Sequence, residues 1–303
     1  MKTELQLIER VRRRVRLPQK RGIVLGIGDD CAIFRPRGGA EDLLFTTDML
    51  LEDVHFRRDT HRAADVGWKV LARGLSDIAA MGGEPRFCLL SLAAAGWADA
   101  RWFDGFYRGF LRLAEMCAAP LVGGDFARAG KTMCDVVVCG AAPRGKALRR
   151  DGARPGNAIF VSGRLGGSAL GLATRRGKAW ERHRRPEPRL ALGRFLREKL
   201  GATSAMDLSD GLSLDLRRLC IASRLAAVIK PPPRFPGATL EQALHGGEDY
   251  ELLFTVPPGI NVPREFGGAP LTKIGEMLSG RPGAVELDGA PLAPLGYDHL
   301  GRA

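Results

Sequence analysis

Five stretches of the sequence place aspartate directly behind small or hydroxyl-bearing residues, where an apolar strand-like run ends or a helix is expected to begin. In the densest, residues 205–212, Asp207 and Asp210 flank Ser209 and precede Gly211. A fold that brings such ends together also gathers their carboxylates, so this pattern restricts how the chain can fold. The other stretches are Gly28-Asp29-Asp30, Thr46-Thr47-Asp48, Leu75-Ser76-Asp77 and Gly123-Gly124-Asp125.

Taken alone, each aspartate could as well be a helix cap or a turn residue as a metal ligand. Asp210, for example, stands where we expect the N-cap of a helix reaching about Cys220. The five stretches together favour magnesium. Hard divalent cations that carry nucleotide phosphates take oxygen ligands from a few aspartates and from water.

The first half of the sequence predicts alternating strands and helices. An amphipathic helix is expected over residues 1–15, and a reversal of the chain at residues 121–125. The helical pattern of 63–75 is followed by what looks like a second helix, which starts near Asp77 and is closed by Gly82-Gly83. The remaining expected elements are strands at 23–27, 43–48, 87–94 and 134–141, and a helix at 99–118.

A composition break separates the two halves. Residues 142–156 are rich in proline, glycine and basic side chains, and we interpret them as a connection between domains. Beyond it, residues 174–189 read as a basic, solvated surface segment. The expected elements are strands at 157–162, 226–229, 271–274 and 284–287 and at the apolar run after Glu251, with helices from about 169 and at 240–244.

Composition sets broader bounds. With 303 residues, 45% of them hydrophobic, the chain is long enough for two cores. A net charge of +12 is compatible with nucleic acid or phosphorylated ligands, but no recognition-helix or zinc-ligand pattern supports nucleic acid. The six scattered cysteines read as reduced thiols. We therefore expect a cytoplasmic protein without membrane or nucleic-acid partners.

Several other residues are candidates for a site. His55 follows an expected strand, although an isolated histidine is more often a packing residue. Among the aromatic residues of 99–118, Tyr107 has the polar group that could reach a ligand. Arg150 lies in the connection, where it is either solvated or directed at phosphates. Glycines precede the acid pair Glu248-Asp249, which again puts carboxylates at a strand edge.

Seven stretches of the sequence resemble motifs of the thiamine-monophosphate kinase family and occur in the same order as in that family. Together they span nearly the whole chain. They are Gly26-Ile27-Gly28-Asp29-Asp30-Cys31-Ala32, Thr47-Asp48-Met49, Val54-His55-Phe56, Leu75-Ser76-Asp77-Ile78-Ala79-Ala80-Met81-Gly82, Val122-Gly123-Gly124-Asp125, Asp207-Leu208-Ser209-Asp210-Gly211-Leu212 and Gly247-Glu248-Asp249-Tyr250-Glu251-Leu252.

The resemblance implies a two-domain fold like that of aminoimidazole-ribonucleotide synthetase. An N-terminal α/β domain, residues 1–142, would bind ATP and Mg²⁺ and dimerise through its sheet. An α+β domain, residues 143–303, would complete the active site. A homodimer would also cover long apolar strand edges, among which we count residues 87–94.

The implied reaction is ATP-dependent phosphorylation of thiamine monophosphate to thiamine diphosphate, by direct in-line transfer assisted by several Mg²⁺ ions. The resemblance leaves room for K⁺ as a further ion. It assigns metal binding to Asp30, Thr46, Thr47, Asp48, Asp77, Asp125, Asp207 and Asp210. It assigns nucleotide binding to Tyr107, Gly124, Arg150 and Ser209, and substrate binding to His55, Glu248 and Tyr297. We expect Asp48, Asp210 and Arg150 to be catalytic.

The chain departs from the family pattern at three places. Gly74 stands where the family usually has asparagine, Phe126-Ala127 where it has two threonines, and Asn157 where it has aspartate. Two other readings stay open: an enzyme of the same fold that activates an amide or carbonyl oxygen with ATP, and a non-catalytic relative that binds nucleic acid. The intact acids argue against the second.

Overall fold

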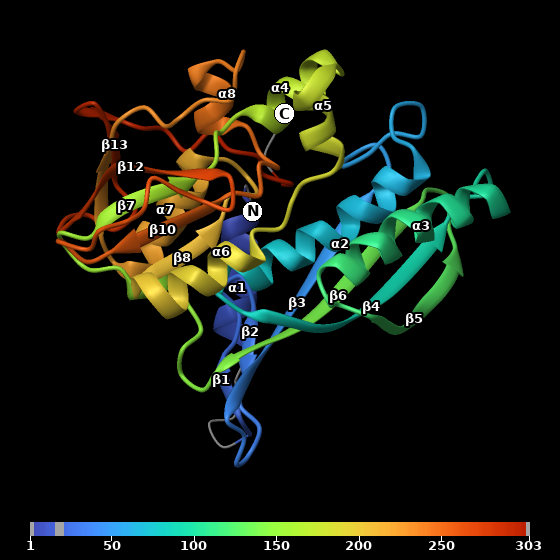
Figure 1. Ribbon diagram of the computed structural model, residues 1–303, viewed down its shortest axis with the longest axis horizontal. Helices are drawn as coiled ribbons and strands as arrows, with labels where there is room; N and C mark the ends of the chain where they lie inside the picture. Colours follow the sequence, from blue (N-terminus) through green and yellow to red (C-terminus); the bar gives the residue numbers. More distant parts are fainter. Residues whose placement is uncertain (1–2, 16–20, 301–303) are drawn as a thin grey trace.

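The computed structural model describes residues 3–15 and 21–300, which form two β-sheets with helices packed on them (Figure 1). The first sheet runs in the order β1-β2-β3-β6-β4-β5, and within it only β4 and β5 pair in parallel. Its strands are β1 (Ile23–Leu25), β2 (Ala32–Phe34), β3 (Glu41–Leu51), β4 (Glu84–Ala94), β5 (Leu121–Arg128) and β6 (Met133–Pro143).

Two long helices, α2 (Ala63–Ala80) and α3 (Ala100–Met116), pack together against this sheet. The even-numbered residues of β3 from Asp42 to Leu50 are its more buried ones, because alternate side chains of a strand point to opposite faces. Phe106 and Phe110 of α3 fill the core with Val136 and Val138 of β6. The strands predicted at 43–48, 87–94 and 134–141 are confirmed as β3, β4 and β6.

The second sheet lies in the C-terminal half and follows the order β14-β13-β9-β12-β7-β10-β8, with β11 paired to β12. Its strands are β7 (Ala158–Ser162), β8 (Ser204–Asp207), β9 (Ala226–Ile229), β10 (Leu252–Val256), β11 (Glu265–Phe266), β12 (Ala269–Leu278), β13 (Val285–Leu287) and β14 (Ala290–Pro291). The helices are α4 (Gly167–Thr174), α5 (Gly177–Arg184), α6 (Leu190–Phe195), α7 (Leu212–Ser223) and α8 (Leu240–His245), with a 3₁₀ turn at Arg150–Gly152 and a π-helical turn at Leu196–Leu200.

The carboxyl end of α2 is held between the two halves of the molecule. Ala79 and Ala80 share a buried cluster with Leu196, which follows α6, and with Leu252 and Phe254 of β10. At Gly193 an added Cβ would lie 2.0 Å from the Ala79 carbonyl oxygen, so glycine lets α6 approach α2 closely. The last turn of α2 is thereby placed beside β8, where the aspartate-rich stretch begins.

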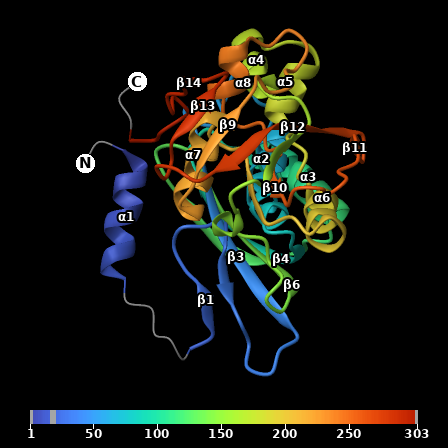
Figure 2. The ribbon, with the colours of Figure 1, turned by 90° about the vertical axis from the view of Figure 1, so that its left-hand side faces the viewer.

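The amphipathic helix expected at the N-terminus is α1 (Glu4–Arg14), which lies beside the rest of the molecule in Figure 2. Thr3 caps it, and the Glu4 amide donates to the Asp298 carboxylate at 3.0 Å. None of its residues is buried. Within the part of the chain that the structure describes, no helix combines the length and apolar character needed to cross a membrane.

The prediction of two helices over 63–83 is wrong, because α2 runs unbroken from Ala63 to Ala80. Its apolar face continues through Leu75 and Ile78, both fully buried. Ser76 and Asp77 find partners on other elements instead of capping a new helix. Asp77 therefore stands near the end of a helix, and the predicted glycine closure follows at Gly82, whose φ is +63°.

The reversal expected at residues 121–125 is also wrong, because these residues belong to β5. A Cβ on Gly124 would come within 1.8 Å of the Leu90 carbonyl oxygen, so this glycine permits close approach to β4. Strand β4 lies between β6 and β5 and is not an edge. The edges of the first sheet are β1 and β5, which corrects the expectation for residues 87–94.

The segment 174–189 is solvated only in part: residues 174–178 are exposed, as predicted. The rest forms most of α5 and the turn after it, and its arginine side chains reach buried acids. Arg184 and Arg185 bind Asp65 of α2, and Arg182 and Arg189 bind Glu251 before β10. Both acids have fully buried side chains, and the segment thus ties α2 to the second sheet.

Candidate active site

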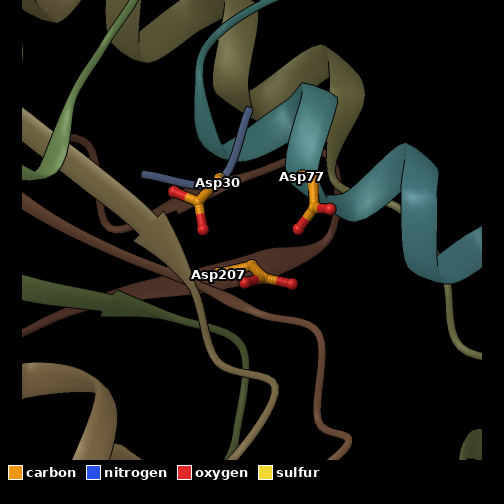
Figure 3. A group of neighbouring side chains, drawn as sticks. All are labelled: Asp30, Asp77 and Asp207. Carbon is orange, nitrogen blue, oxygen red and sulfur yellow. The ribbon is translucent and has the colours of Figure 1, made fainter. Parts of the chain in front are cut away.

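Three aspartates from distant parts of the sequence meet between the two sheets. Asp30 belongs to the turn between β1 and β2, Asp77 to the last turn of α2, and Asp207 to the end of β8, and Figure 3 shows their carboxylates facing one another. One carboxylate oxygen from each lies within 4.8 Å of the others. The sequence placed all three in the predicted metal-binding set, and the structure brings them together.

Each carboxylate of this group, which we call the Asp triad (Asp30, Asp77, Asp207), also has a polar neighbour. Thr46 of β3 donates its hydroxyl to Asp77. Ser76 donates to Asp207 at 2.6 Å, which links α2 directly to β8. Arg150 donates to both oxygens of Asp30, with Nε at 3.3 Å from Oδ2. The positions of the acids are therefore determined by contacts between elements as well as by their own backbones.

The Asp29 carboxylate holds the backbones of Asp30 and Arg150 in place. One of its oxygens accepts the Asp30 amide at 3.0 Å and the other accepts the Arg150 amide at 3.1 Å. Burial and the neighbouring charge of Asp30 raise the pKa of Asp29 to about 7, although Arg150 opposes this shift. Asp29 thus joins the turn after β1 to the segment that connects the two sheets.

The triad is electrostatically unfavourable without a cation. Burial raises the pKa of both Asp77 and Asp207 well above the usual range, and nearby carboxylates raise both further. A bound divalent cation would offset this repulsion, and carboxylate oxygens are the ligands that Mg²⁺ prefers. The donor set and its spacing therefore fit a hard divalent cation.

Strand β3 and helix α2 run side by side and contact each other at regular intervals. Thr46 pairs with Asp77, and Asp48 accepts from Arg73 at 2.6 Å. Further on, the carbonyl of His55 accepts from Lys69 at 3.1 Å. Two strand residues and four helix residues both advance by about 6 Å, so the contacts stay in register. Residues 69, 73 and 77 form one polar stripe on α2.

Glu248 lies at the end of this stripe away from the triad. Its carboxylate accepts from the fully buried Lys69 at 2.9 Å and lies 3.4 Å from His183. Burial would raise the pKa of Glu248, but Lys69, His183 and Arg73 together lower it to about 2. The residue is an anion with a left-handed φ of +64°, held by a 2.7 Å bond from its amide to the Ser209 carbonyl. Such a backbone is retained where the surroundings over-determine it.

Asp210 is not the N-cap of α7, as the sequence suggested. The N-cap is Gly211, and Asp215 reaches back to accept the amides of Asp210 and Gly211 at 3.0 Å each. The Asp210 side chain instead binds Arg218. Because Asp215 accepts the two amides that lead into the helix, the Asp210 carboxylate is not needed there and is directed to another partner.

The C-terminal aromatic residue predicted to bind substrate lies next to this loop. The Tyr297 amide donates to the Asp210 carbonyl at 2.9 Å, while its ring is 49% exposed. His299 lies edge-on to that ring with centroids 4.8 Å apart, and 5.2 Å from the ring of His55. The predicted substrate residues His55 and Tyr297 are thus joined through His299, which the sequence analysis did not identify.

Four predicted residues do not join this group within the described chain. The Thr47 side chain points to the opposite face of β3 from Thr46 and Asp48, and donates to Asp135. Tyr107 packs edge-on against Phe106 in α3, and Gly124 and Asp125 lie on the edge strand β5. Figure 1 shows β5 and α3 at the far side of the first sheet from the second sheet.

Two of the three departures from the family motifs, Gly74 and Asn157, have local explanations. A Cβ on Gly74 would come within 2.7 Å of the Val138 side chain, so α2 packs on β6 through the absence of a side chain. Asn157 is buried and its Oδ1 accepts from Thr203 at 2.6 Å and from the Arg154 amide at 3.1 Å. Phe126 is 58% exposed and lies edge-on to Phe103. The structure offers no explanation for Ala127.

The sequence analysis identified Arg150 but missed three other cations of the site. Lys69, Arg73 and Arg218 each bind a predicted acid, yet none lies within a motif that draws attention to it. Spacing offers one signal for two of them. Lys69 and Arg73 precede Asp77 by eight and four residues, and residues four apart share one face of a helix.

Comparison with known proteins shows the family to which the chain belongs. Residues 28–143 match the family model described as AIR synthase related protein, N-terminal domain. The thiamine-monophosphate kinase of Escherichia coli K12 is 37% identical, with 98% of each chain covered, and that of Bacillus subtilis is 36% identical over 77% of each.

Solved structures agree with this. The structure of AaThiL complexed with AMPPCP and TMP has a TM-score of 0.85 at 32% identity and covers 98% of this chain and 97% of that one. Thiamine-monophosphate kinase from Stenotrophomonas maltophilia has a TM-score of 0.74 at 36% identity, covering 96% and 98%. The hydrogenase maturation protein HypE, at 17% identity, shares the fold alone. The predicted fold, like that of aminoimidazole-ribonucleotide synthetase, is thus confirmed, and the chain belongs to the thiamine-monophosphate kinase family.

Proposed function

We propose that this enzyme transfers the γ-phosphoryl group of ATP to thiamine monophosphate and forms thiamine diphosphate. The observation that carries the proposal is the Asp triad, in which three carboxylates from separate elements converge within 4.8 Å. The similarity to a ThiL structure complexed with AMPPCP and TMP supports the choice of substrates. The last strand of the first sheet ends at Pro143, and the first strand of the second sheet begins at Ala158. This supports our proposal of two domains, residues 1–142 and 143–303.

In this proposal the triad binds Mg²⁺ with help from three neighbouring residues. These are Asp48, Asp210 and Thr46, whose hydroxyl donates to Asp77. When bound, Mg²⁺ would neutralise charge on the phosphates. Arg150, fixed on Asp30, would face the phosphates of the nucleotide, and Ser209 would contact it from the loop after β8. The family roles of Thr47 and Asp125 at metal, and of Tyr107 and Gly124 at nucleotide, rest on the resemblance alone.

The acceptor requires little chemistry from the protein. A phosphate monoester has a second pKa of about 6, so it is largely a dianion at neutral pH and needs no strong general base. The chain's residues have to align it with ATP and reduce the repulsion between two anions. The exposed Tyr297 could stack its ring on the cationic thiazolium of thiamine monophosphate. The anionic Glu248 could accept a hydrogen bond from the end of the substrate that lies away from its phosphate.

The test is a Mg²⁺-dependent assay of ADP formation with ATP and, in turn, thiamine monophosphate, thiamine and aminoimidazole precursors. ADP formed only with thiamine monophosphate supports the proposal. Turnover only with an amide or carbonyl substrate would instead identify a different enzyme of the same fold. Salt-dependent DNA binding without any turnover would indicate a non-catalytic relative.

We predict that transfer is direct and inverts configuration at a chiral γ-phosphorus. A phosphoenzyme would need an activated nucleophile. The His55 side chain is buried, its Nδ1 already accepts the Leu51 amide at 3.0 Å, and no carboxylate among the described residues hydrogen-bonds to its ring to activate it. Stereochemical analysis of the product checks this. Net retention, or exchange of label between ADP and ATP without acceptor, would require a covalent intermediate.

We also propose that the enzyme is a homodimer built through the first sheet. Helices α2 and α3 pack against this sheet, yet Met49 of β3 is 51% exposed, and the edge strand β5 exposes Val122 and Phe126. A second copy would cover such a surface. Light scattering at micromolar concentration is expected to give twice the mass of the chain. A monomer there would contradict the proposal.

A further inference from the structure

Arg73 is a charged residue inside the site that none of the roles above uses. It lies on α2 one turn from Asp77 in one direction and one turn from Lys69 in the other, so all three share one face. Its side chain is only 11% exposed. Burying a guanidinium is costly unless it is paired, so its position calls for an explanation.

The hydrogen bonds of Arg73 engage only part of the guanidinium. Nε and Nη2 both donate to the same oxygen, Asp48 Oδ1, at 3.0 and 2.6 Å. Nη1 lies 3.6 Å from Glu248 Oε1, which is too long for a hydrogen bond. Glu248 Oε1 itself is a buried oxygen without a hydrogen-bond partner among the described residues.

A second arginine–aspartate pair, between Arg35 and Asp42 of β3, illustrates an ion pair with a structural role only. Arg35 donates Nε to Asp42 Oδ1 at 2.6 Å and Nη2 to Asp42 Oδ2 at 2.8 Å, one bond to each oxygen. This is the two-pronged geometry that makes arginine–carboxylate pairs strong. Arg73 does not adopt it, and among the described residues neither Asp48 Oδ2 nor Arg73 Nη1 has a hydrogen-bond partner.

The position of Arg73 along α2 matches what an acceptor needs. It stands about 6 Å along the helix axis from the level of Asp77, where the triad lies, and about 6 Å from that of Lys69. Lys69 holds Glu248, near which His55 contributes its carbonyl. A molecule bound between Glu248 and the triad would therefore pass Arg73, with its phosphate end between Arg73 and the acids.

We propose that Arg73 binds the phosphate monoester of the acceptor and makes the enzyme prefer a phosphorylated acceptor to the same molecule without its phosphate. The inference rests on the proposed function and deepens it. Arginine suits this role, since its planar fork matches phosphate oxygens and it stays charged at every working pH. Asp48 keeps the guanidinium oriented before the acceptor arrives.

The test measures equilibrium binding of thiamine monophosphate and of thiamine to the full-length enzyme with Mg²⁺ and the ATP analogue AMPPCP. The Arg73→Met variant is expected to bind thiamine monophosphate on the order of thirtyfold more weakly than wild type, because a charge-assisted bond is lost. Thiamine is a cation without phosphate. Its affinity is expected to stay within about threefold or to rise, since a positive charge has been removed.

Two further variants serve as controls. Arg73→Lys keeps the charge without the fork and is expected to recover part of the affinity for thiamine monophosphate. Arg35→Met removes the matched arginine that pairs with β3 and is expected to leave both affinities unchanged. Thermal unfolding of each variant shows whether it is folded.

Equal weakening of both ligands in Arg73→Met would show that Arg73 only supports Asp48 and Glu248, and would overturn the inference. Unchanged affinity for thiamine monophosphate would overturn it as well, with the proposed function intact. A wild-type enzyme that neither binds nor phosphorylates thiamine monophosphate would overturn both.

Discussion

Replacing Asp207 with asparagine is expected to lower turnover by on the order of a hundredfold or more, with the fold retained. Asparagine has nearly the same shape and can still accept the hydroxyl of Ser76, which donates to Asp207 at 2.6 Å. The change therefore removes charge and little else. Electrostatic stabilisation of the transferred group is usually the largest catalytic contribution, and this carboxylate belongs to the set that would hold Mg²⁺.

The same substitution is expected to stabilise the metal-free enzyme increasingly as the pH rises above about 3.8. Burial and the charge of Asp30 raise the pKa of Asp207 in the folded state. A carboxyl group whose pKa is raised by folding costs stability as pH rises from its unfolded pKa, near 3.8, through its folded one. The asparagine side chain of the Asp207→Asn variant does not ionise, so its advantage over wild type grows with pH across that window.

Two measurements check this prediction: steady-state rates over a range of Mg²⁺ concentrations, and thermal unfolding in chelator at several pH values. Asp151→Asn is a suitable control, because Asp151 is adjacent to Arg150 in sequence but 43% exposed and paired only with Arg149 among the described residues. It is expected to leave the rate and stability nearly unchanged. An Asp207→Asn enzyme that kept near-normal rates at limiting Mg²⁺ would remove Asp207 from the metal site.

The acids of the site could be predicted from sequence because each carries a local signal. Asp207 follows a strand, Asp30 follows a glycine turn, and Asp77 precedes the glycine closure of a helix. The convergence of these ends is a property of the fold, and the family resemblance supplied it. The wrong details, such as a helix starting at Asp77, arose because serine and aspartate favour helix starts, whereas contacts with Thr46 and Asp207 hold them inside α2.

The buried cations could not be predicted in the same way. Arginine and lysine are mostly exposed, so a sequence reading assigns them to the surface unless a partner is known. For Arg184 the partner is Asp65, 119 residues away in the sequence, and for Lys69 it is Glu248, 179 residues away. No local period connects such pairs. Only the packing of α5 and the Glu248 loop against α2 brings them together.

Glu251→Ala is expected to have the largest effect on stability, lowering the free energy of unfolding at neutral pH by about 3 kcal/mol. The Glu251 side chain is fully buried and accepts from Arg182 at 2.7 Å, from Arg189 at 2.7 and 2.9 Å, and from Ser162 at 2.5 Å. Removing it leaves two guanidinium groups, 19% and 14% exposed, without their shared carboxylate. The melting temperature is expected to fall by roughly 6 to 12 °C.

A matched control and a pH series make this prediction specific. Glu187 also pairs with Arg189, at 3.0 Å, but its side chain is 74% exposed, so Glu187→Ala is expected to change stability by less than about 0.5 kcal/mol. Burial would raise the pKa of Glu251, but Arg182 and Arg189 outweigh it and lower that pKa below its usual 4.5. The contribution of Glu251 is therefore complete above its unfolded pKa and is lost as pH falls through the folded pKa. The difference in unfolding free energy between wild type and Glu251→Ala should therefore become smaller in acid. Equal stability of the Glu251→Ala and Glu187→Ala variants at neutral pH would show that the buried ion pairs do not hold the 174–189 segment in place.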